Sequence, residues 1–191
     1  MFPIEAFRGP VERFVAILRS LDIRHHLTGG VVSVAWGEPR LTQDIDIVID
    51  RVSTLANVQT FIDAVRSAGF YADEQGVRNA VQSGKPFQLL DPVEVLKLDV
   101  YPRELIPGEL SRSVLAEVFP GSSIPIVSRS DAAVSKLIWV SRGSHKSRQD
   151  LRQIVRRLSE VEVSFLRTHA SRLQLTDLLE SVLSESEELL E

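Results

Sequence analysis

Apolar and polar residues alternate with two different periods along the chain. After Pro10 the apolar residues recur every three or four positions, which predicts an amphipathic helix near the start. The β-branched block at residues 45–49 gives the strongest strand signal, and residues 87–90 and 93–101 predict two further strands joined by a turn. Strands are therefore expected within about the first 105 residues.

Helical spacing marks the segments outside these strands. The apolar residues from Leu55 to Val65 predict a helix, with Ser53 or Thr54 as its N-cap. From Ser130 onward, helical spacing recurs through the rest of the chain. The second half is therefore expected to consist of helices.

The length and composition set the size of this fold. A chain of 191 residues, of which 43% are hydrophobic, corresponds to one domain or to one domain with a small appendage. The two kinds of periodicity predict a mixed α/β (α+β) fold, in which helices flank a mixed β-sheet and a helical C-terminal part follows. We place the α/β core at residues 1–125 and the helical region packed on it at residues 126–191.

Composition also excludes several classes of protein. No apolar run approaches the ~18 residues that a membrane span requires, and the first residues lack the pattern of a secretory signal. Cysteine is absent, which excludes disulfides and thiolate metal sites. We therefore expect a cytoplasmic protein with no membrane partner.

The charge is unevenly distributed. The net charge of −4 argues against broad, charge-driven binding to nucleic acid. Residues 142–157 nevertheless carry six basic residues and one acid, whereas the chain from Thr176 carries only acids. The basic stretch is either a solvated helix face or a local wall that receives phosphates.

The candidate chemistry begins with Asp44 and Asp46, at the start of the strongest strand. Residues two apart on a strand point to the same face, with Cα atoms about 6.5 Å apart. Two carboxylates so close repel each other unless a positive charge compensates, and Mg²⁺ binds carboxylate oxygens. The alternative is that both acids cap the strand end in solvent.

Two further features add to this pair. Gly29 and Gly30 stand between an extended segment and a short helix, where backbone N–H groups can approach a phosphate. Asp99 lies within an apolar strand, where it either completes a carboxylate site for two Mg²⁺ ions or forms a salt bridge with Lys97.

These residues resemble the signature of the nucleotidyltransferase superfamily that includes DNA polymerase β, and in particular its branch of AbiEii-type toxins and related prokaryotic proteins. The matching string is Gly29-Gly30-x-x-Ser33-x-x-x-Gly37-x-Pro39-Arg40-x-Thr42-x-Asp44-Ile45-Asp46-Ile47. Later matches are Lys97-Leu98-Asp99, Lys136-x5-Arg142 and Arg148-Gln149-Asp150-Leu151.

The resemblance implies a nucleotidyltransferase-like sheet and a metal-dependent transfer of a nucleoside monophosphate from an NTP to a hydroxyl of an RNA, protein or small-molecule acceptor. It implies that Asp44, Asp46 and Asp99 ligate Mg²⁺, with two ions or with Mn²⁺ in their place, and act in catalysis. It further implies nucleotide binding by Gly29, Gly30, Arg40, Thr42 and Lys136. A toxin–antitoxin role, with an antitoxin-like protein partner, follows from the same branch.

Other functions remain open at this point. A non-catalytic module that binds a nucleotide or a protein on the same scaffold is the alternative. A metal-dependent phosphohydrolase would use similar acids but usually adds histidine ligands, and a zinc site from the four histidines is not favoured.

Several single residues have a structural interpretation beside the functional one. The spacing of Ser147 and Asp150 is that of a helix capping box. Lys136 is interpreted either as a surface lysine or as a phosphate ligand. Trp36 and Trp139 fall on helical stripes and are expected in the core rather than as stacking platforms.

Overall fold

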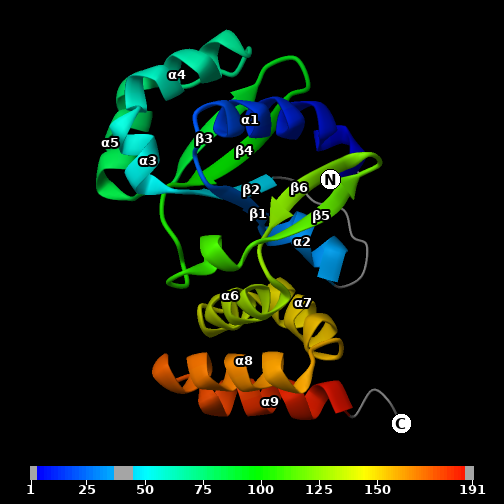
Figure 1. The fold of residues 1–191 in the computed structure, drawn as a ribbon. Helices are drawn as coiled ribbons and strands as arrows, with labels where there is room; N and C mark the ends of the chain where they lie inside the picture. Colours follow the sequence, from blue (N-terminus) through cyan, green and yellow to red (C-terminus); the bar gives the residue numbers. More distant parts are fainter. Residues whose placement is uncertain (1–3, 37–44, 188–191) are drawn as a thin grey trace.

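A single mixed sheet forms the centre of the molecule (Figure 1). The computed structural model describes residues 4–36 and 45–187. Within them the strands are β1 (His25–Thr28), β2 (Ile45–Ile49), β3 (Phe87–Asp91), β4 (Leu96–Tyr101), β5 (Val114–Phe119) and β6 (Ser122–Ile126). Their order is β3-β4-β2-β1-β6-β5, in which β2 with β4 and β1 with β6 are parallel and the other pairs antiparallel. The predicted mixed sheet flanked by helices is confirmed.

The helices gather in two groups around the sheet (Figure 1). The first group consists of η1 (Ile4–Phe7), α1 (Arg8–Ser20), α3 (Arg51–Ala56), α4 (Val58–Ser67) and α5 (Glu74–Ser83). The second consists of α6 (Arg129–Ser141), α7 (His145–Val155), α8 (Glu160–Arg172) and α9 (Thr176–Glu187). Helix α2 (Gly29–Trp36) contacts the sheet and also α6 and α7, and η2 (Glu109–Arg112) precedes β5.

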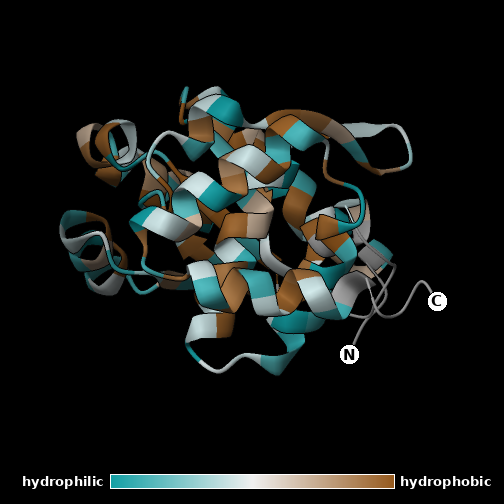
Figure 2. Ribbon diagram, turned by 90° about the horizontal axis from the view of Figure 1, so that it is seen from below, coloured by the Kyte–Doolittle hydropathy of each residue, from teal (hydrophilic) through white to brown (hydrophobic). Residues whose placement is uncertain are grey.

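The core is continuous from the first helix to the last. Phe14 makes edge-to-face contacts with Phe61 and Phe70, with both pairs of ring centroids 6.1 Å apart. The same apolar cluster includes Leu137 of α6 and Leu179 of α9. Figure 2, seen from the side of α8 and α9, shows hydrophilic and hydrophobic residues alternating along the helices. The helical C-terminal part therefore buries its apolar face against the rest, and the boundary between 125 and 126 stays a prediction.

The expectation that strands lie within about the first 105 residues is wrong. The hairpin of β5 and β6 spans Val114–Ile126, and β6 joins the sheet beside β1. Strand β5 lies at the edge of the sheet, where Leu115 is 72% exposed and only Phe119 is fully buried. An edge strand that is exposed on both faces has no regular alternation, and so gives no strand signal.

The expected helix at 55–65 also differs in detail. It is two helices, α3 and α4, and α3 is capped by Asp50 instead of Ser53 or Thr54. The Asp50 carboxylate accepts hydrogen bonds from the Ser53 backbone N–H at 3.0 Å and the Ser53 hydroxyl at 2.7 Å. Asp50 therefore follows β2 as the N-cap of α3, and its carboxylate is used by this cap and does not join Asp46.

Among the helices that the structure describes, none combines the length and the apolar character that a bilayer crossing requires.

The capping role of Asp50 leads to a stability prediction. Asp50→Ala should lower the free energy of unfolding by about 1 kcal/mol, because the first turn of α3 loses its N-cap. Burial alone would raise the pKa of Asp50, but hydrogen bonds from Ser53 and the charge of Arg24 together lower it. Its contribution is therefore present above the unfolded pKa of about 4 and is lost as the pH falls through the lower folded value.

Urea unfolding at neutral and acidic pH measures both effects, with the exposed Asp63→Ala as control. An equal loss of stability in both variants would contradict the cap.

Candidate functional site

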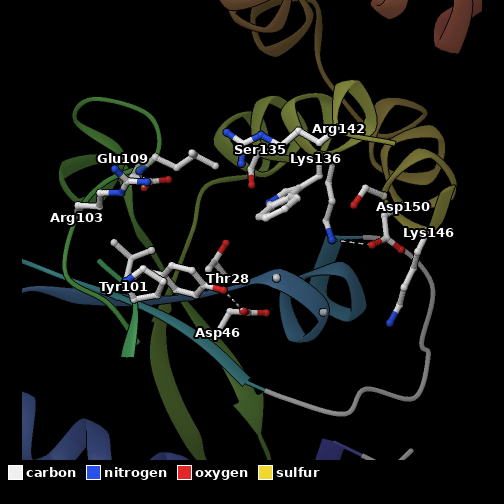
Figure 3. A pocket seen from close by; sticks show the side chains of 17 residues that line it. Thr28, Asp46, Tyr101, Arg103, Glu109, Ser135, Lys136, Arg142, Lys146 and Asp150 are labelled. Carbon is white, nitrogen blue, oxygen red and sulfur yellow. Dashed lines mark hydrogen bonds and ion pairs between the residues drawn. The ribbon is translucent and has the colours of Figure 1, made fainter. Parts of the chain in front are cut away.

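A pocket of about 350 Å³ lies between the sheet and the helices α6 and α7 (Figure 3). Its walls come from the end of β1, the start of α2, strands β2 and β4, the loop after β4, and the two helices. The volume is within the range of small-molecule sites. Four of the predicted site residues line it, namely Gly29, Gly30, Asp46 and Lys136.

Gly29 forms the junction between β1 and α2. Its φ of +70° is in the left-handed region, which side chains other than hydrogen rarely adopt. A Cβ at this position would overlap the side chain of Asp46, from its Cβ to its carboxylate. The acidic side chain therefore lies directly against the start of α2, and only glycine allows this approach.

Asp46 is held in place by the neighbouring strand. The Tyr101 hydroxyl donates a hydrogen bond to Asp46 Oδ1 at 3.0 Å (Figure 3). In the parallel pairing of β2 with β4, Asp46 stands beside Asp99. The two predicted carboxylates are thus neighbours across adjacent strands, and both offer the oxygen donors that Mg²⁺ prefers.

Asp99 is less directly part of the pocket. Its carboxylate forms an ion pair with Lys97 Nζ at 2.8 Å, which is the alternative that the sequence left open. Its side chain is 13% exposed, and the pocket lining includes Asp46 but not Asp99. A ligand role for Asp99 would require this ion pair to loosen, and it stays a prediction.

The other part of the acidic box cannot be placed. Arg40, Thr42 and Asp44 lie outside the described residues. Within residues 4–36 and 45–187, no three acidic or histidine side chains are grouped as a metal site. Of the expected triad, the described residues include Asp46 and Asp99, whose carboxylate oxygens suit a hard cation, and their binding of a metal stays a prediction.

Lys136 lies in the opposite wall of the pocket. Its ammonium forms an ion pair with Asp150 Oδ2 at 2.6 Å, and both side chains are largely buried. Lys136 is therefore not a surface lysine. The capping box expected from Ser147 and Asp150 is wrong, because α7 begins at His145 and is capped by Ser144, whose hydroxyl accepts the Ser147 N–H at 3.2 Å.

The comparison with known families decides the classification. The sequence profile described as "Nucleotidyl transferase AbiEii toxin, Type IV TA system" matches residues 16–178, most of the chain. The chain belongs to this AbiEii family. No curated protein sequence is similar enough to count as a relative.

One solved structure supports the fold of this AbiEii family member. An antigenic nucleotidyltransferase-like protein from Paracoccidioides brasiliensis is 20% identical, with a TM-score of 0.52 and 92% of each chain covered. At that identity the likeness shows the fold alone. The lincosamide antibiotic adenylyltransferase LnuA, with bound lincomycin, is 16% identical with a TM-score of 0.47, covering 75% of this chain and 93% of that one. The antibiotic-resistance factor ANT(2'')-Ia is 10% identical with a TM-score of 0.47, covering 94% and 92%.

The basic residues at 142–157 of this family member lie in two different environments. Arg142 and Lys146 line the pocket, whereas Arg148 forms an ion pair with Glu185 of α9, and Arg152 lies 3.9 Å from the same carboxylate. Arg142 and Lys146 are thus placed in the pocket wall, where binding of phosphate stays a prediction, whereas Arg148 and Arg152 connect α7 to α9 and do not form a solvated face.

The core position expected for Trp139 is wrong. Its side chain is 42% exposed and lines the pocket, and the Arg142 guanidinium lies 5.0 Å from its ring centroid. Trp36 packs against the core, and its ring N–H donates to the Val127 carbonyl at 2.9 Å. Both tryptophans fall on helical stripes, so helical spacing alone does not distinguish the exposed Trp139 from the packed Trp36.

Glu109 is a pocket residue that the sequence did not single out. It is 2% exposed, yet its carboxyl group lines the cavity. It lies in an irregular segment, where no periodic pattern marks a buried position. The sequence ELSR around Glu109 contains no signal that distinguishes this acid from an exposed one.

The contact between Gly29 and Asp46 leads to a second prediction. Gly69 also has a positive φ, of +89°, but an added Cβ there would meet no atom within 4 Å. Gly69→Ala should therefore cost about 1 kcal/mol from backbone strain alone. Gly29→Ala should cost at least about 1 kcal/mol more, because the overlap with Asp46 is added to the strain.

Urea unfolding of the two variants, and of Gly29→Ala in an Asp46→Ala background, measures this difference. The additional loss of stability in Gly29→Ala, relative to Gly69→Ala, should become smaller when the Asp46 carboxylate is removed. Equal costs for the two glycine variants would show that Asp46 does not contact Gly29.

Proposed function

We propose that this protein transfers a nucleoside monophosphate from an NTP, with Mg²⁺ or Mn²⁺, to a hydroxyl of an RNA, protein or small-molecule acceptor. The observation that carries the proposal is the convergence of Gly29, Gly30, Asp46 and Lys136 on one pocket. These residues come from segments far apart in the chain. Membership of a nucleotidyltransferase family supports the same type of reaction.

The phosphate end of the pocket is built from backbone and basic side chains. The first residues of α2 present N–H groups and the positive end of a helix dipole, both of which favour phosphate. Lys136 and Lys146 add positive charge from α6 and α7. Since Lys136 already holds Asp150, it is oriented before the nucleotide binds.

The acidic box would hold the cation. Asp46, with Asp99 beside it and Asp44 two positions earlier, supplies the carboxylate oxygens. When bound, Mg²⁺ neutralises charge that develops on the phosphates. Tyr101 holds the Asp46 carboxylate in one orientation, and so fixes the side of the pocket on which the α-phosphate lies.

The reaction balances without a further reactant. The acceptor hydroxyl oxygen bonds to the α-phosphorus, the α–β phosphoanhydride bond breaks, and pyrophosphate leaves with the bonding electrons. The hydroxyl proton passes to a carboxylate, a role that the family resemblance assigns to Asp99. For Asp99 to accept it, the ion pair with Lys97 has to open.

One observation favours the alternative of a binding module. Asp99 is engaged by Lys97 and lies outside the pocket lining. A protein that binds a nucleotide, or an antitoxin-like partner, without transferring a nucleotide would not require this carboxylate to be available. Binding and transfer therefore have to be measured separately.

The decisive variant is Asp46→Asn, which keeps the shape and the oxygen that accepts from Tyr101 but removes the charge. We expect label transfer from α-³²P-labelled NTPs to total RNA or cell extract, in Mg²⁺, to fall at least about a hundredfold. Asp99→Asn should also reduce transfer, while Mg²⁺-dependent nucleotide binding, measured by calorimetry, is retained.

Asp63→Asn, at an exposed position on α4, is the matched control and should leave transfer unchanged. Nucleotide binding without transfer in the wild type would support the binding module. If Mg²⁺ has no effect on nucleotide binding, the proposed metal site is wrong.

The exposed indole of Trp139 lines the pocket and offers an aromatic face on which the nucleotide base can stack. We expect Trp139→Ala to weaken nucleotide binding by about tenfold or more, because an aromatic face that stacks on a base contributes about 1–3 kcal/mol. Trp139→Phe should retain most of the affinity, since it keeps an aromatic face. Calorimetric titration of each variant with Mg²⁺-NTP measures the effect, and equal affinities for the Ala variant and the wild type would exclude stacking.

A further inference from the structure

Glu109 stands at the end of the pocket away from the lysines. It is the first residue of η2, in the connection between β4 and β5. Figure 3 shows Glu109 beside Arg103 on one side of the cavity and the Lys136–Asp150 pair with Lys146 on the other. The pocket therefore has a basic end on α6 and α7 and a second end that contains a buried carboxyl group.

The two oxygens of this carboxyl group have different surroundings. Oε1 accepts the Leu105 backbone N–H at 2.6 Å. The Ile106 backbone N–H also contributes a hydrogen bond to the carboxyl group, and Oε2 lies 4.0 Å from His26 Nε2. That distance is too long for a hydrogen bond. A carboxylate has about four acceptor positions, so this 2% exposed group can still accept a hydrogen bond from a molecule in the pocket that it lines.

His26 is the buried neighbour of this carboxyl group. Its ring is fully buried, and Nδ1 lies 2.8 Å from the Ser113 hydroxyl. Nε2 is buried without a hydrogen-bond partner in the described part of the chain. A buried ring nitrogen without a partner costs free energy, but His26 does not line the pocket, so a molecule there would be held by Glu109.

The charges around Glu109 are predominantly negative. Glu104 and Asp131 raise its pKa together with burial, which is the largest cause, to about 7. Arg112 and Arg103 are cations on this side of the pocket, and Arg112 forms two hydrogen bonds with Asp131, at 2.9 and 2.7 Å. Burial lowers the pKa of His26 to about 4, so the ring is neutral near pH 7 and adds no positive charge. Arg103 lines the pocket but forms no ion pair with Glu109 in the described residues.

We propose that Glu109 forms a subsite for a protonated amine on the acceptor molecule, with the amine donating a hydrogen bond to Oε2. That the amine belongs to an acceptor molecule rests on the proposed nucleotidyl transfer, whereas the amine subsite itself rests on the buried Glu109 carboxyl group in the pocket wall. A cation adds positive charge to this end of the pocket, where the carboxyl groups of Glu104, Glu109 and Asp131 outnumber the two guanidinium groups. A charge-assisted hydrogen bond is also stronger than one from a neutral hydroxyl.

The two ends of the pocket then orient the two substrates. Anionic phosphates lie against α2 and the lysines, and the cationic group of the acceptor lies against Glu109. An acceptor hydroxyl between them is directed towards the side of Asp46. Because Glu109 must be ionised to hold the amine, acceptor binding is coupled to proton release from Glu109 near neutral pH.

Three matched six-carbon polyols test this subsite: 1-amino-1-deoxysorbitol, sorbitol and gluconate, which differ in charge. The Trp139 indole N–H lines the same pocket and gives an NMR signal for titrations, assigned with Trp139→Phe. We expect the amine to bind at least about tenfold more tightly than sorbitol, and gluconate to bind most weakly. The amine stays protonated over the pH range used, as a lysine side chain does.

The pH dependence has a defined sign. Glu109 is largely protonated below its raised pKa, so the affinity for the amine should rise several-fold from about pH 6 to about pH 8, while the affinity for sorbitol stays constant. This measurement uses the wild-type protein and does not depend on a variant that folds.

Glu109→Gln should abolish both the preference for the amine and its pH dependence, while Oε1 still accepts from Leu105. Glu104→Gln is the matched control, because it removes a charge from the same loop, but from a carboxylate whose oxygens accept from the Gly108 and Leu110 N–H groups. The Glu104→Gln variant should keep at least about half of the wild-type preference for the amine over sorbitol.

Equal binding of the amine and sorbitol by the wild type, or a preference that survives in Glu109→Gln, overturns the subsite. The outcome is separable from that of the proposed function. An amine preference without label transfer retains the subsite and rejects nucleotidyl transfer, whereas label transfer without an amine preference does the reverse.

Discussion

The approach of Asp46 to Gly29 is the contact on which the rest of the site depends. An aspartate on β2 lies against the first residue of α2, and any side chain at that residue would displace it. Tyr101 fixes the same carboxylate from β4. A negative side chain and the positive end of a helix are thereby brought to one place, where a cation and a phosphate can each find an opposite charge.

The C-terminal helices complete this arrangement from the other side. The apolar face of α6 packs into the common core, and Lys136, at the edge of that face, reaches the pocket and pairs with Asp150 of α7. Arg142 and Lys146 follow in the same wall, while Arg148 and Arg152 bind α9 by Glu185. The helical part therefore contributes both the packing that holds the wall and the positive charges within it.

The sequence predicted the parts of this site that depend on local pattern. The aliphatic run of β2 locates Asp46, and the glycine pair after an extended segment locates the start of α2. Contacts between distant segments were not predictable, because nothing near Lys136 indicates that Asp150, on another helix, neutralises it. The edge strand β5 and the position of Trp139 were misjudged, since exposure depends on which elements cover them. Glu109 was missed because an irregular turn carries no periodic sign of burial.

The central claim is that a nucleotide and its metal ion bind in the pocket beside the contact between Gly29 and Asp46, and a crystal structure tests it most directly. Crystals grown with Mn²⁺ and a non-hydrolysable analogue of the NTP that binds most tightly would locate the metal by its anomalous signal. The account predicts the ion on an Asp46 oxygen and the triphosphate against the N–H groups at the start of α2. A nucleotide bound elsewhere, or an ion that does not contact Asp46, would contradict it.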